Sequence, residues 1–79
     1  MQTERIYQLV GNAMKGVRRS AHLKQADLAT VLGLSRGAIA NMETGRQRMT
    51  LETIQQFCDY FEIPMHTLFE AIDQARRTP

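Results

Sequence analysis

The stretch QADLATVLGLSRGAIANMETG, residues 25–45, decides the fold. Residues 25–32 carry apolar side chains at helical spacing, and Gly33 follows them. Glycine ends helices because it adopts the left-handed conformation without steric cost. Ser35 then offers a hydroxyl that can cap the free N–H groups of a second helix over residues 36–44. The segment therefore predicts two short helices joined by a tight turn, with the second one presented outward.

Outward from this stretch, the apolar spacing predicts three more helices, so the fold class is all-α. One helix covers residues 3–20, one begins after the cap Thr50, and one begins with Pro64 as its first residue. Glycines at 11 and 16 weaken the first helix, and residues 76–79 fray. The expected core side chains are Ile6, Leu9, Val10, Ala13, Val17, Leu28, Val31, Leu32, Leu34, Ile39, Met42, Leu51, Ile54, Phe57, Cys58, Phe61, Leu68 and Phe69.

Length and composition narrow the class of protein. The 79 residues form one domain, 1–79. A single cysteine, Cys58, cannot form an internal disulfide, which fits a reducing cytoplasm. We expect Cys58 to be a small buried hydrophobic residue. No stretch is long enough to span a membrane, and residues 1–5 do not begin a signal peptide. The two histidines lie far apart with no metal-ligand spacing, and no catalytic pattern is present. We expect a cytoplasmic protein without metal or cofactor, and not an enzyme.

The charge is divided along the chain. Residues 1–48 carry eight basic and three acidic side chains, whereas residues 49–79 carry two basic and five acidic ones. A basic front and an acidic back would orient the molecule on a polyanion. The alternative, that both are ordinary solvated faces, stays open.

A set of motifs resembles the lambda-repressor/Cro-type helix-turn-helix family, also called xenobiotic-response-element-like. The motifs are Arg18, LKQADLA at 23–29, GLS at 33–35, Ile39, METGR at 42–46, Ile54 and FEIPMHTLF at 61–69. The resemblance covers about residues 13–69 and leaves 70–79 as a C-terminal extension. It implies a five-helix DNA-binding domain in which residues 25–32 and 36–44 form the helix-turn-helix, the second helix lying in the major groove.

The resemblance assigns DNA contacts to the second helix and its surroundings. Arg36 suits guanine and Asn41 suits adenine, with Ser35 beside them as a third base-reading residue, although Arg36 could instead hold a phosphate. Gly37 either admits the DNA backbone closely or leaves a base pair unread. Expected phosphate contacts are Lys24, Gln25, Gly37, Arg46, Gln47 and Arg48. The alternatives are a first-turn polar residue for Gln25 and a solvated loop for residues 46–48. Lys24 departs from the usual Ser, Thr or Asn cap, at a cost of ~1 kcal/mol.

The resemblance also assigns structural roles. It implies a buried ion pair between Arg18 and Glu43 that ties the first helix to the third. The expected dimer surface is the apolar remainder of the last helix, formed by Met65, Ile72 and Ala75. The alternative is that Ile72 only extends the core.

The resemblance implies a homodimeric transcriptional regulator that binds double-stranded DNA at a near-palindromic operator, which in this family can lie next to the regulator's own gene. Such regulators include phage repressors and the controllers of restriction-modification systems. The alternative is an antitoxin that binds both a toxin and its own promoter. Whether a toxin or a polymerase subunit is a partner stays open.

Overall fold

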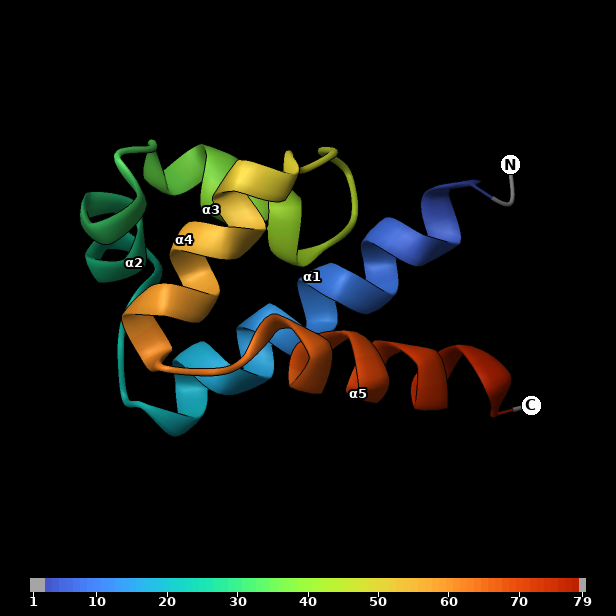
Figure 1. Ribbon diagram of the computed structural model, residues 1–79. Coiled ribbons are helices and arrows are strands. Elements are labelled where there is room, and N and C mark those ends of the chain that lie inside the picture. Colours follow the sequence, from blue (N-terminus) through green and yellow to red (C-terminus); the bar gives the residue numbers. More distant parts are fainter. Residues whose placement is uncertain (1–2, 79) are drawn as a thin grey trace.

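The computed structural model describes residues 3–78, with side chains placed for residues 5–78, and this part of the chain folds into five helices without a strand (Figure 1). The helices are α1 Thr3–Ser20, α2 Gln25–Leu32, α3 Arg36–Glu43, α4 Leu51–Phe61 and α5 Met65–Arg77. α2 packs on α3, and α1 contacts both α3 and α5. The predicted all-α class is confirmed. None of the described helices has the length and apolar character needed to cross a membrane.

The helix ends follow the capping residues named from the sequence. Gly33 ends α2 with φ 66°, and the Ser35 hydroxyl accepts a hydrogen bond of 3.0 Å from the N–H of Ala38. The Thr50 hydroxyl caps α4 in the same way through the N–H of Thr53, at 3.0 Å. α3 ends at Glu43, one residue earlier than predicted, because the following threonine is already its C-cap.

α5 differs from the prediction at both ends. Pro64 precedes the helix instead of starting it, because its ψ of 138° is not helical, and its carbonyl accepts from the N–H groups of the first turn. Arg76 and Arg77 were expected to fray, but both lie in α5 and pair with Asp73 one turn earlier, at 2.7 and 2.9 Å. These hydrogen bonds hold the pKa of the Asp73 carboxyl below its usual range. Pro79 lies outside the described residues.

One apolar core joins the five helices, with Phe57 fully buried near its middle and packed against Phe61 at 4.8 Å between ring centroids. Cys58 is buried, as expected, and burial together with the charge of Asp59 raises the pKa of its thiol. The buried apolar residues are Val10, Met14, Leu28, Ala29, Leu32, Ile39, Met42, Met49, Ile54, Phe57, Cys58, Leu68 and Ile72.

Four residues expected in the core are instead exposed. Leu51 is 71% exposed because it is the first residue of α4 and lies beyond the edge of the core. Ile6 lies near the start of α1, beside Arg76 near the end of α5, and is 37% exposed. Val31 and Phe69 are each 38% exposed, because their buried neighbours Leu32 and Leu68 occupy the inward face of α2 and α5. The apolar stripes are therefore narrower than their spacing predicts.

Gly11 sets the distance between α1 and α3. A Cβ at this position would overlap the carbonyl oxygen of Met42 and lie 3.0 Å from the carbonyl atoms of Glu43. Only glycine allows the two backbones to approach this closely. The feature that weakens α1 as an isolated helix is therefore the one that lets it pack against α3.

Candidate nucleic-acid interface

α3 presents one polar face to solvent. Ile39 and Met42 are buried, whereas Arg36, Gly37 and Asn41 are exposed. This division follows from the helical period, since positions three apart share a face. These three residues, and the exposed Ser35 before them, therefore lie where a ligand could reach them. The short α2 and its glycine turn hold α3 on the outside of the molecule (Figure 1).

A buried ion pair joins α1 to the end of α3, as expected. Arg18 donates from Nε to Glu43 Oε2 at 2.7 Å and from Nη2 to Oε1 at 3.1 Å, so the contact is bidentate. Its third hydrogen bond, from Nη1 to the carbonyl of Leu23 at 2.6 Å, also fixes the turn before α2. The side chains are 9% and 2% exposed. Arg18 is therefore a structural residue and lies away from the outward face of α3.

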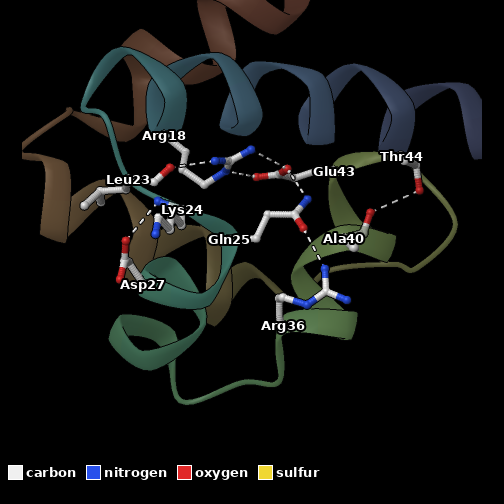
Figure 2. A network of polar contacts seen from close by, with 9 residues as sticks. All are labelled: Arg18, Leu23, Lys24, Gln25, Asp27, Arg36, Ala40, Glu43 and Thr44. Carbon is white, nitrogen blue, oxygen red and sulfur yellow. Dashed lines mark hydrogen bonds and ion pairs between the residues drawn. The ribbon is translucent and has the colours of Figure 1, made fainter.

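Gln25 extends this pair to the surface. Figure 2 shows its side chain between Glu43 and Arg36, with one half of the amide facing each. Its Nε2 donates to Glu43 Oε1 at 3.0 Å, and its Oε1 accepts from Arg36 Nη1 at 3.1 Å. The sequence predicts Gln25 as a phosphate contact or a first-turn polar residue, and it does not predict this bridge. We call the chain of Arg18, Glu43, Gln25 and Arg36 the polar relay.

The start of α2 compensates for its unusual cap. Lys24 has no side-chain acceptor, but its backbone N–H donates to the Asp27 carboxylate at 2.9 Å, which is half of a capping box. The carboxylate in the first turn also favours the helix dipole. The expected loss of a cap is therefore offset by a residue three positions later. The Lys24 side chain itself is exposed.

The loop after α3 is held at both ends. The backbone N–H groups of Arg46 and Gln47 both donate to the carbonyl of Asn41, at 2.8 and 3.3 Å, and Gly45 turns the chain with φ 80°. At the far end, Met49 is buried in the core with 8% exposure. Between these anchors the side chains of Arg46 and Arg48 are exposed.

The charge divided along the chain has a counterpart in space on its basic side. Lys24 just before α2, Arg36 of α3 and Arg46 and Arg48 of the following loop are exposed, and α3 and this loop lie at the top of Figure 1. α5, at the bottom of the same view, carries Glu70 and Asp73 together with Arg76 and Arg77, so its formal charges balance. The α3 side is therefore the one that favours a polyanion.

Comparison with known proteins fits this geometry. A family model described as a helix-turn-helix domain matches residues 9–71. The chain belongs to the helix-turn-helix domain family. It is 29% identical over 59 residues to the ImmF control region 10 kDa protein of Bacillus phage phi105. The match covers 75% of this chain and 66% of the phage protein, just under two thirds of that protein's length.

Solved structures share the fold of this helix-turn-helix protein. The clp gene regulator ClgR from Corynebacterium glutamicum superposes with a TM-score of 0.84 at 16% identity, covering 94% of this chain and 96% of ClgR. The restriction-modification controller protein C.AhdI from Aeromonas hydrophila superposes with a TM-score of 0.77 at 22% identity, covering 86% of this chain and 99% of C.AhdI. At these identities the likeness shows the fold.

The helix-turn-helix protein does not expose the whole apolar face expected on α5. Ile72 is 4% exposed and belongs to the core, so the expectation that it is exposed is wrong. The reason is that α5 packs against α1 and α4, and Ile72 lies in the core that the helices share. Met65 is half-buried against the core, and Ala75 is exposed.

Proposed function

We propose that this helix-turn-helix protein is a transcriptional regulator that binds a near-palindromic operator as a homodimer. The observation that carries the proposal is the polar relay, which fastens the exposed Arg36 at the start of α3 to the buried pair of Arg18 and Glu43. A recognition helix reads bases with its N-terminal residues, so a preorganised arginine at that end suits readout of DNA.

The bases are read by three side chains in this proposal. Arg36 pairs with the O6 and N7 acceptors of a guanine, the commonest specific contact in the major groove. Asn41 pairs with an adenine and Ser35 contacts a neighbouring base, although Ser35 also caps α3 through Ala38. Gln25 accepts a hydrogen bond from one N–H of the Arg36 guanidinium, so the remaining N–H donors of this group can contact the base.

Phosphate contacts flank the reading helix on two sides. On the α2 side they come from Lys24 and from Gln25, whose amide retains a second N–H beside the one given to Glu43. On the other side they come from Arg46, Gln47 and Arg48, while Gly37 lets a DNA strand approach α3 closely. These contacts position the protein without reading sequence.

A dimer follows from the size of the reading helix. The eight residues of α3 span about 12 Å, which matches about four base pairs. Two copies related by a two-fold axis place their helices one DNA turn apart, about 34 Å. The longest extent of one copy, 34 Å, is compatible with that spacing. In the proposed dimer Met65 and Ala75 on α5 face the partner copy, without Ile72.

The names of the relatives support a role in gene control. The phage relative is a control-region protein, ClgR is a clp gene regulator, and C.AhdI is a restriction-modification controller. We therefore propose that the operator lies close to the gene for this protein, so that the regulator acts on its own expression.

Footprinting of the purified protein on the DNA upstream of its own gene tests the proposal, with the stoichiometry measured by native mass spectrometry of the complex. The expected result is a protected near-palindrome with half-sites about one DNA turn apart and two chains bound. A complex with one chain on a single half-site would contradict the dimer. Equal binding to every sequence would contradict specific regulation.

A further inference from the structure

A polar groove separates the N-terminal half of α1 from the loop that follows α3, outside the polar relay. It is lined by Tyr7, Gln8, Thr44, Gly45, Arg46 and Arg48. Two guanidinium groups, a phenol, an amide and a hydroxyl thus border one hollow of the surface. Such donors are suited to an anionic oxygen ligand.

The loop is fixed against α1 by a close backbone contact. A Cβ on Gly45 would lie 2.8 Å from the Cα and 2.9 Å from the N of Gln8, so only glycine fits here. With Met49 buried at the other end of the loop, the position of Arg48 beside α1 follows from the packing of the backbone.

Tyr7 lies under the end of the Arg48 side chain. The guanidinium carbon of Arg48 is 5.9 Å from the centroid of the Tyr7 ring, within the range of a cation–π contact. This contact uses the charge of the guanidinium and needs none of its N–H donors. The ring therefore restrains a long exposed side chain and leaves its hydrogen-bonding groups available.

We propose that Tyr7 is a positioning residue that holds Arg48 ready for a phosphate of the DNA backbone. The inference rests on the phosphate role proposed for Arg48 above. An arginine that is already restrained loses less side-chain entropy on binding, so the ring raises affinity without touching a base. The effect is the same on every sequence, because a phosphate contact carries no sequence information.

A double-mutant cycle on duplex DNA of random sequence tests this, and it needs no knowledge of the operator. The variants are Tyr7→Leu, Tyr7→Phe, Arg48→Ala and the double variant Tyr7→Leu/Arg48→Ala, compared by fluorescence anisotropy at fixed low salt. We expect Tyr7→Leu to weaken binding about two- to fivefold, the equivalent of an exposed cation–π contact. Tyr7→Phe keeps the ring and should keep the affinity. In the Arg48→Ala background, Tyr7→Leu should have no further effect.

The outcomes separate this inference from the function on which it rests. If Arg48→Ala leaves affinity unchanged, both the phosphate role of Arg48 and the role of Tyr7 are wrong. If Arg48→Ala weakens binding but Tyr7→Leu does not, only the inference is wrong. The same holds if Tyr7→Leu costs as much in both backgrounds or if Tyr7→Phe behaves like Tyr7→Leu. A loss of fold stability in Tyr7→Leu, measured by urea unfolding, affects both backgrounds alike and cancels in the cycle.

Discussion

Arg18 and Arg36 stand at opposite ends of the polar relay, and their surroundings differ in every respect that matters. Arg18 is buried and neutralised by Glu43, whereas Arg36 is exposed and bonded to the neutral amide of Gln25. A buried, paired charge fixes the fold, but its positive charge is not available to a ligand. An exposed charge held by a neutral partner keeps its full charge for an anion or a base. One residue type thus serves stability at the inner end and recognition at the outer end.

Breaking the inner end should have the largest effect. Glu43→Ala leaves the Arg18 guanidinium buried without a counter-charge and should lower the free energy of unfolding by ~3–5 kcal/mol, measured by urea denaturation followed by circular dichroism. The matched control is Asp73→Ala, which removes a carboxylate from an exposed ion pair on α5 and should leave the transition nearly unchanged. Equal stability of the Glu43 variant and wild type would show that the relay does not hold α1 to α3.

The second contact between α1 and α3 is the close backbone approach at Gly11, and two glycines of α1 test it. Gly11→Ala places a methyl group against the Met42 carbonyl and should destabilise the protein by ~1–3 kcal/mol. Gly16→Ala meets open space and should stabilise α1 by ~0.5–1 kcal/mol. Thermal unfolding should move in opposite directions for the two variants. A stabilising shift in both variants would mean that helix propensity alone decides the result.

A substitution in the loop after α3 should have the smallest effect, and this effect should be on DNA binding and not on stability. Arg46→Ala should weaken binding to all DNA sequences and reduce the slope of log Kobs against log salt by about 0.9 for the lost phosphate contact. It should leave the unfolding transition unchanged because the side chain is exposed. Titrations at several salt concentrations, with Arg19→Ala on α1 as a charge-matched control, measure the slope. A slope equal to that of wild type would remove Arg46 from the interface.

Local signals predicted most of the fold. The caps and the glycine turn fixed the helix ends because each depends on neighbours in the chain. Periodicity was less successful at the start of α4, where Leu51 has the right spacing but lies beyond the edge of the core. It also failed at Ile72, whose burial depends on how α5 packs against its neighbouring helices. The close approach at Gly11 could not be predicted, since it depends on where α3 crosses α1.

The site was predicted in part for the same reason. The ion pair of Arg18 and Glu43 came from the family resemblance, and the structure confirms it. The bridge joins Gln25 to Glu43, 18 positions later in the chain, and to Arg36, 11 positions later. No local pattern in the sequence indicates such contacts. Two features of the sequence could have suggested this bridge, the long polar side chain at the start of α2 and the arginine at the start of α3.

We propose that Arg36, at the outer end of the polar relay, reads sequence without contributing to stability. Competition binding of Arg36→Ala to the operator and to random DNA, with its urea unfolding measured on the same sample, tests this proposal. We expect discrimination to fall by ~1–3 kcal/mol, about five- to 150-fold, while the unfolding midpoint stays that of wild type. Unchanged discrimination, or a loss of stability in place of it, would show that Arg36 does not read the operator.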